Sequence, residues 1–166
     1  MNEQNYLLGI DVGSTTVKVA IMDQVGEILY SEYRRHFARI QETLAEVLRR
    51  ASEKLGSVPV LPAITGSGGM ALAQAMKIPF VQEVIAVSES LDRRYPQTDV
   101  AIELGGEDAK ILYLTGGRDQ RMNGICAGGT GSFIDQMAAL LGTDAEGLNE
   151  YARNYKRIYP IAARCG

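Results

Sequence analysis

Two segments of the chain repeat one pattern: an acid, a glycine two positions later, and a lysine five positions after that glycine. The first segment is GIDVGSTTVKVAI, residues 9–21, and the second is AIELGGEDAKILYL, residues 101–114. Asp11 and Glu103 occupy equivalent positions, 103 − 11 = 92 residues apart. Successive backbone N–H groups in a glycine-containing turn form a concave site for an anion. The repeat therefore predicts two matched phosphate-binding turns that face one nucleotide.

The side chains of the two turns suit phosphates and a divalent cation. A carboxylate repels phosphate but suits Mg2+, which binds through carboxylates, retained waters and phosphate oxygens. We expect Asp11, Glu103 and Glu107 to be catalytic, the first two by holding Mg2+ through water. Two ordinary β-hairpins with solvent-facing acids are the alternative, against which the matched copies argue. The residues expected to contact the phosphates are Gly13, Ser14, Thr15, Lys18, Gly105 and Gly106.

The apolar pattern predicts a strand before and after each turn, and further elements that position them. The flanking strands are expected at 7–11, 17–22, 100–104 and 109–115. Other strands are expected at 27–33, 60–65, 121–125 and 158–164. Helical spacing of apolar residues predicts helices at 38–55, 70–76 and 132–141, whereas 84–91 fits helix or strand. This mixture of elements predicts an α/β fold.

A break in the apolar pattern at Tyr95–Asp99 divides the chain into two lobes. We expect the first lobe at 1–96 and the start of the second at 97–166. The strand expected at 158–164 would enter a core, yet the sequence stops two residues later, whereas domains usually end at a surface position. The sequence therefore predicts an N-terminal fragment with an incomplete second lobe.

Composition and charge exclude several classes of protein. The chain has 166 residues, of which 46% are hydrophobic and 22% charged, with a formal net charge of -3. These values are typical of a globular protein and argue against a general nucleic-acid binder. No apolar run approaches the ~18 residues of a membrane span, and the first residues do not form a signal peptide. We therefore expect a cytoplasmic protein that binds neither nucleic acid nor membrane.

The chain contains two cysteines and one histidine. Because no secretion signal is present, a structural disulfide between Cys126 and Cys165 is not expected, and both thiols fit core positions. His36 follows Arg34 and Arg35, and this charged neighbourhood predicts a solvated surface residue rather than a catalytic base.

The two turns resemble the first and second phosphate loops of the actin, sugar-kinase and heat-shock ATPase superfamily. This resemblance implies an actin-like ATPase (ribonuclease H-like) fold, with mixed sheets flanked by helices, that binds ATP. Further segments resemble the activators of 2-hydroxyacyl-CoA dehydratases and the ATPase subunits of benzoyl-CoA reductase. These segments are TGSGG at 65–69, MNGICAGGTGSFIDQMAALLG at 122–142 and PIAARCG at 160–166.

The narrower resemblance implies an ATP-dependent activator that passes an electron from a [4Fe-4S] cluster to a CoA-thioester dehydratase or related reductase. It implies that Cys126 and Cys165, 165 − 126 = 39 residues apart, each ligate the cluster. A cluster needs four thiolates, so a homodimer would supply two from each subunit. The free N–H groups at the start of the helix after Cys126 would favour this anionic cluster. A ferredoxin or flavodoxin would donate the electron.

Several alternatives remain beside this hypothesis. Residues 128–131, GGTG, also fit a third phosphate turn with Cys126 as a small core residue. A kinase for a sugar or small acid would need a carboxylate base but no cysteines, and a nucleotide-regulated binding module would need no redox chemistry. The family often has aspartate where Glu103 stands and glutamine where Glu107 stands, so both roles are open. As an N-terminal fragment, the chain alone is expected to lack ATPase activity.

Overall fold

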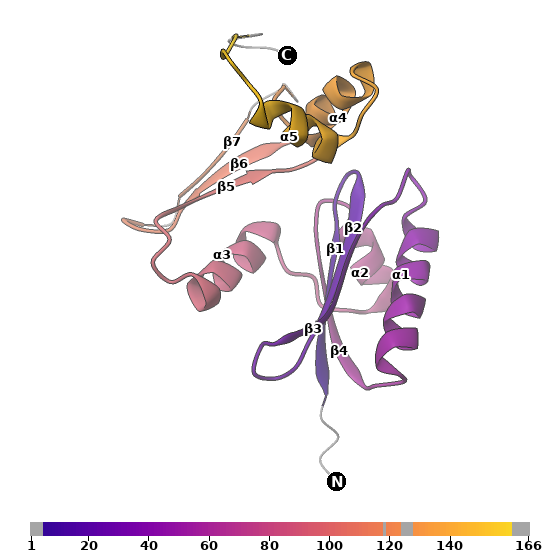
Figure 1. The fold of residues 1–166 in the computed structure, drawn as a ribbon. Coiled ribbons are helices and arrows are strands. Elements are labelled where there is room, and N and C mark those ends of the chain that lie inside the picture. Colours follow the sequence, from indigo (N-terminus) through magenta and orange to yellow (C-terminus); the bar gives the residue numbers. More distant parts are fainter. Residues whose placement is uncertain (1–4, 118, 124–127, 161–166) are drawn as a thin grey trace. The chain divides into compact units, whose positions relative to one another are not determined.

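The computed structural model describes residues 5–117, 119–123 and 128–160 of the chain. The chain divides into two units, Met1–Pro96 and Gln97–Gly166. Each unit forms its own sheet with its own helices, so each is described by itself (Figure 1). Among the helices in these ranges, none is long and apolar enough to cross a membrane.

The first unit contains a mixed sheet with strand order β3-β2-β1-β4. Strand β1 pairs antiparallel with β2 and parallel with β4. The strands are β1 (Tyr6–Val12), β2 (Thr16–Met22), β3 (Ile28–Arg35) and β4 (Val60–Thr65). The helices are α1 (Ile40–Leu55), α2 (Gly69–Met76) and α3 (Glu83–Arg94). Figure 1 shows α1 on one side of this sheet and α3 on the other.

The two faces of this sheet differ because side chains alternate along a strand. Ile10, Val19 and Ile64 are buried on the face that packs against α1 and α2. The alternation turns Asp11 and Lys18 to the other face, where a cavity of about 670 Å³ lies between the sheet and α3. The polar residues of the first turn are therefore carried by the same strands that form the core.

The second unit contains an antiparallel sheet with strand order β5-β6-β7. Its strands are β5 (Val100–Leu104), β6 (Ala109–Tyr113) and β7 (Asp119–Met122). Its helices are α4 (Gly131–Leu140) and α5 (Ala145–Arg153). Asp144 caps the start of α5, since its Oδ1 accepts a hydrogen bond from the Gly147 N–H at 2.9 Å.

Most of the predicted elements are present. The segment at 84–91, which fitted helix or strand, is helical and belongs to α3. Helix α5 was not predicted, because its nine residues include Gly147. Strand β7 begins two residues before the predicted 121–125. The strand expected at 158–164 is wrong over 158–160, which have no regular structure. Ile158 is 84% exposed there, and the rest of that segment lies outside the described residues.

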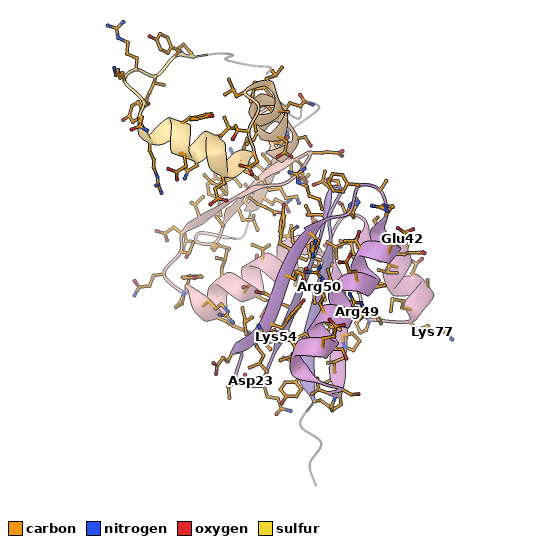
Figure 2. The ribbon with its side chains drawn as sticks, turned by 45° about the vertical axis from the view of Figure 1, so that its right-hand side comes forward. Asp23, Glu42, Arg49, Arg50, Lys54 and Lys77 are labelled. Carbon is orange, nitrogen blue, oxygen red and sulfur yellow. The ribbon has the colours of Figure 1, made fainter. Side chains whose placement is uncertain are left out.

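A partly buried charge cluster fastens α1 to the outer strand β3. Glu32 accepts hydrogen bonds from the Tyr30 hydroxyl and, at 2.6 Å, from Arg34 Nε. Arg50 of α1 lies 3.6 Å from the same carboxylate, and Lys54 Nζ lies 5.7 Å from the centre of the Tyr30 ring. Figure 2 labels Arg50 and Lys54 on α1. The Tyr30 hydrogen bond, followed by Arg34, lowers the pKa of Glu32 against the opposing effect of burial. Burial and the neighbouring Glu32 raise the pKa of Tyr30 to about 12.

Replacing Glu32 with glutamine should lower the free energy of unfolding at pH 7 by about 1–3 kcal/mol, because charge-assisted hydrogen bonds are lost. Folding lowers the pKa of Glu32 below its ordinary value of 4.5. The stabilisation is therefore complete above that value and disappears as the pH falls through the lowered pKa. Urea unfolding of both proteins should show a difference that shrinks as the pH falls below 4.5.

Glu53→Gln is the matched control for this prediction. The Glu53 carboxylate is 61% exposed and pairs with Arg49 along α1. Exposed pairs of this kind contribute little, so the control should change the unfolding free energy by less than ~0.5 kcal/mol. Equal losses in the two variants at pH 7 would show that the Glu32 cluster has no special role.

Candidate phosphate-binding site

The first turn joins β1 to β2 and places an acid beside a lysine. The Gly13 N–H donates to the Thr16 carbonyl at 2.9 Å, which closes the turn. Asp11 and Lys18 are cross-strand partners, and Lys18 Nζ donates to Asp11 Oδ2 at 2.8 Å. Lys18 Nζ also lies 5.9 Å from the centre of the Tyr33 ring. The Lys18 side chain is 40% exposed, so its charge remains accessible to an anion.

The second turn has the same construction at equivalent positions. The Gly105 N–H donates to the Asp108 carbonyl at 2.8 Å, which repeats the first closing bond 105 − 13 = 92 residues later. Glu103 and Lys110 are cross-strand partners. Lys110 Nζ lies 3.1 Å from Asp108 Oδ2 and 3.6 Å from Glu103 Oε1. The Lys110 side chain is only 5% exposed, so here the lysine neutralises two acids inside the unit.

Residues 65–69 support the first turn from β4. The Gly68 N–H donates to the Val12 carbonyl at 2.8 Å, and the Ser67 N–H donates to Glu83 Oε1 at 3.1 Å. Gly66 has φ +99, and a Cβ added to it would lie 2.5 Å from the carbonyl carbon of Val12. Only glycine fits this close contact, which explains the first glycine of the TGSGG segment.

His36 follows β3 and is buried against the first turn, with 5% of the residue exposed. Its Nε2 lies 3.1 Å from the Gly13 carbonyl oxygen, and its backbone N–H donates to the Thr15 carbonyl at 3.1 Å. The expectation of a solvated surface histidine is therefore wrong. The two arginines that precede His36 do not reveal that the chain bends back at this point.

The second turn is held by the start of α4. The Gly131 N–H donates to the Gly105 carbonyl at 2.8 Å, and the Ser132 N–H donates to the Gly106 carbonyl at 2.8 Å. The buried Thr130 hydroxyl also donates to the Gly106 carbonyl, at 3.1 Å. These two N–H groups of the helix start are thus used inside the unit, and the expectation that they are free to face an anionic cluster is wrong.

Neither Gly13 nor Gly105 has a positive φ, so conformational freedom does not explain these glycines. At Gly105 an added Cβ would collide with the Asp108 side chain and lie 3.2 Å from the Asp108 carbonyl oxygen. At Gly13 an added Cβ would have no neighbour nearer than 3.6 Å, so the absence of a side chain leaves room beside the turn.

Within each unit, the structure gathers the expected site residues around one turn. The first turn and its strands carry Asp11, Gly13, Ser14, Thr15 and Lys18, and the second carries Glu103, Gly105, Gly106 and Glu107. Ser14 and Glu107 are exposed. Sequence reasoning missed His36, Thr65, Asp108 and Thr130. Cys126 and Cys165 lie outside the described residues.

Two buried oxygen atoms beside the first turn bear on the Mg2+ hypothesis. Asp11 Oδ1 and Thr65 Oγ1 have no hydrogen-bond partner among the described residues, and the two residues are in register on β1 and β4. Both residues line the cavity between the sheet and α3. Buried oxygens of this kind need a water or a cation, so this donor set fits a hydrated Mg2+. In the described ranges no three His, Cys, Asp or Glu side chains gather around one point, so such an ion would depend on water and phosphate oxygens.

Comparison with known proteins adds independent information. The model of the BadF/BadG/BcrA/BcrD ATPase family matches residues 8–165. The chain is 31% identical to the 2-hydroxyisocaproyl-CoA dehydratase activator of Clostridioides difficile, over 96% of this chain and 61% of that relative. It is also similar in structure to component A of the Acidaminococcus fermentans (R)-2-hydroxyglutaryl-CoA dehydratase. That match has a TM-score of 0.78 and 27% identity, and it covers 97% of this chain and 63% of the other.

A second solved structure is the activator of the 2-hydroxyisocaproyl-CoA dehydratase from Clostridium difficile with bound ADPNP. The match has a TM-score of 0.79 and 26% identity, and it covers 96% of this chain and 61% of the other. The present chain therefore spans less than two thirds of the length of each of these relatives. The structural matches confirm the α/β class and the actin-like ATPase fold.

Gly66→Ala should lower the free energy of unfolding of the first unit by roughly 2–4 kcal/mol, through the clash with Val12 and the left-handed φ. Gly13→Ala is the matched control, because an added methyl group meets only ordinary contacts there. Its effect should be below about 1 kcal/mol. Chemical denaturation measures the free energy of unfolding of both variants. If Gly66→Ala were as stable as Gly13→Ala, the close contact between Gly66 and Val12 would be contradicted.

Proposed function

Because this chain belongs to the BadF/BadG/BcrA/BcrD ATPase family, we propose that its two turns bind the phosphates of Mg-ATP in an activator of a CoA-thioester dehydratase. One observation carries the proposal: the same hairpin occurs twice, with the same closing hydrogen bond and the same acid–lysine pair across its strands. A chain with ordinary surface hairpins has no reason to repeat all of these features. The solved relative with bound ADPNP, an ATP analogue, supports the same ligand.

In this proposal the first turn supplies most of the direct contacts to the phosphates. The backbone N–H groups of Ser14 and Thr15 bind phosphate oxygens beside Gly13, whose own N–H donates to the Thr16 carbonyl. Lys18 is accessible and adds a positive charge. Asp11 holds a hydrated Mg2+ through Oδ1, the carboxylate oxygen that Lys18 does not bind. Thr65 offers its hydroxyl to the same hydration shell.

The second turn is proposed to approach the phosphates from the second lobe. Gly106 supplies its backbone N–H beside Gly105, whose own N–H donates to the Asp108 carbonyl. Glu103 contacts the hydrated Mg2+ through water. Lys110 is buried between acids and therefore keeps the charge of this turn low enough for an anion to approach. The exposed Glu107 is proposed to orient the water that attacks the terminal phosphate. We propose the lobes themselves as 1–96 and 97–166, the latter being the start of the second lobe.

The activator role requires that the nucleotide site be connected to a redox centre. We propose that Cys126 and Cys165 supply two thiolates, and that a second copy of the chain in a homodimer supplies two more. When bound, a [4Fe-4S] cluster supplies one-electron chemistry. Thr130 follows Cys126 by four residues and donates to the Gly106 carbonyl, so the second turn is bonded to the segment that carries this cysteine.

Through this connection, ATP binding and hydrolysis would move the cysteine segment together with the second turn. The electron would come from a ferredoxin or flavodoxin in the cytoplasm and pass to the dehydratase or a related reductase. The names of the relatives support a dehydratase as the acceptor.

Asp11→Asn should remove the dependence of ATP binding on Mg2+, because an amide holds a hydrated cation far less well than a carboxylate. Calorimetric titration with ATP, with and without Mg2+, is the measurement. Mg2+ should strengthen binding to the wild type by at least about tenfold, equivalent to about 1.4 kcal/mol, and should have little effect on the variant. Glu53→Gln on α1 serves as the control and should behave as the wild type. An equal effect of Mg2+ on all three proteins would refute the role of Asp11.

Cys126→Ser and Cys165→Ser should each prevent formation of a normal cluster, since one copy then offers a single thiolate. Anaerobic reconstitution with iron and sulfide, followed by iron and sulfide analysis and sedimentation, tests this. The wild type should bind four irons per two chains and dimerise, as four thiolates per cluster require. If either serine variant kept that stoichiometry, the cysteine concerned would not be a ligand.

A further inference from the structure

We propose that His36 is a positioning residue of the first phosphate turn, whose imidazole holds the Gly13 carbonyl inward and thereby directs the Ser14 N–H toward the phosphates. The inference rests on the proposed function for the identity of the ligand. The anchoring of the turn stands on the geometry around His36.

The contacts of the imidazole determine which nitrogen carries the proton. The backbone N–H of Ala38 donates to His36 Nδ1 at 3.1 Å. A backbone amide is always a donor, so Nδ1 must be the unprotonated nitrogen. The proton is therefore on Nε2, which donates to the Gly13 carbonyl oxygen at 3.1 Å. The ring thus connects two backbone groups and is fixed in both tautomer and orientation.

The hydrogen bond to Gly13 controls more than one atom. The Gly13 carbonyl and the Ser14 N–H belong to one planar peptide group, in which they point in opposite directions. Holding the carbonyl against the buried imidazole therefore turns the Ser14 N–H outward, at an exposed residue. Without the imidazole, the peptide next to a glycine could rotate and present its partially negative oxygen to the phosphate.

The backbone after β3 is bent to deliver this contact. Phe37 and Ala38 have φ values of 46 and 63, a left-handed conformation that is unfavourable for residues other than glycine. The bend brings the Ala38 N–H onto His36 Nδ1, and α1 begins two residues later. Two consecutive strained residues persist only where the surrounding structure enforces them, and such sites often have a function.

The second turn offers an independent comparison. The Gly105 carbonyl, equivalent to that of Gly13, accepts a hydrogen bond from the Gly131 N–H at 2.8 Å. In both turns, therefore, the equivalent carbonyl accepts a hydrogen bond from a donor elsewhere in the protein. In the second turn this donor is a backbone N–H, whereas in the first it is the His36 side chain, which can be replaced without changing the backbone.

The first test reads the tautomer directly. His36 is the one histidine of the chain, so the imidazole nitrogens of the 15N-labelled protein give unambiguous signals in a long-range 1H–15N spectrum. We expect a protonated Nε2 and an unprotonated Nδ1 at neutral pH. A protonated Nδ1, or rapid exchange between tautomers, would overturn the anchoring whether or not the protein binds ATP.

The second test uses two amide replacements of similar polarity. In His36→Gln the side-chain NH2 can reach the position of Nε2 and donate to Gly13, whereas the shorter side chain in His36→Asn reaches only the position of Nδ1. His36→Asn should weaken Mg-ATP binding by about tenfold, and His36→Gln should stay within about threefold of the wild type. The Ser14 amide signal should shift with Mg-ATP in the wild type and in His36→Gln.

The outcomes separate the inference from the proposed function. Equal affinities for His36→Asn and His36→Gln would overturn the positioning role while leaving nucleotide binding intact. A wild type that shows the Nε2–H tautomer but binds no Mg-ATP would overturn the proposed function instead. Phe37→Leu, at a neighbouring side chain that is 74% exposed, is the control and should retain the wild-type affinity. Urea unfolding of each variant identifies any loss of affinity that comes from a loss of folded protein.

Discussion

A turn that binds phosphate must keep its carbonyl oxygens away from the anion, because they carry partial negative charge, and must leave its N–H groups outside. In this protein donors from other parts of the chain meet that requirement. The carbonyls of Val12 and Gly13 are held by Gly68 and His36, and the carbonyl of Gly105 is held by Gly131. The backbone of each turn is thereby oriented before any ligand arrives.

Much of the remaining structure follows from supplying these donors. Strand β4 runs parallel to β1, so that its C-terminal end reaches the first turn and positions the glycines of 65–69. Strand β3 ends at the same turn, where the strained residues after His36 fold its ring inward. In the second unit, the buried Thr130 hydroxyl and the start of α4 perform the same task.

The sequence predicted those features that depend on local pattern. The repeat, the flanking strands and α1 follow from residue type and spacing, so the hairpins could be placed without a structure. The roles of His36 and Thr130 could not be predicted from the sequence, because each side chain is hydrogen-bonded to a carbonyl more than 20 residues away in the chain. Helix α5 also escaped prediction, since it is only nine residues long and contains Gly147.

A structure of the protein with Mg2+ and a non-hydrolysable ATP analogue would test whether the two turns bind the phosphates. We expect phosphate oxygens within hydrogen-bond distance of the Ser14 and Gly106 N–H groups, and a hydrated Mg2+ whose water contacts Asp11 Oδ1. We also expect the Gly13 carbonyl to remain bonded to His36. Phosphates bound away from both turns, or a Gly13 carbonyl turned toward them, would show that the turns do not bind phosphate in this way.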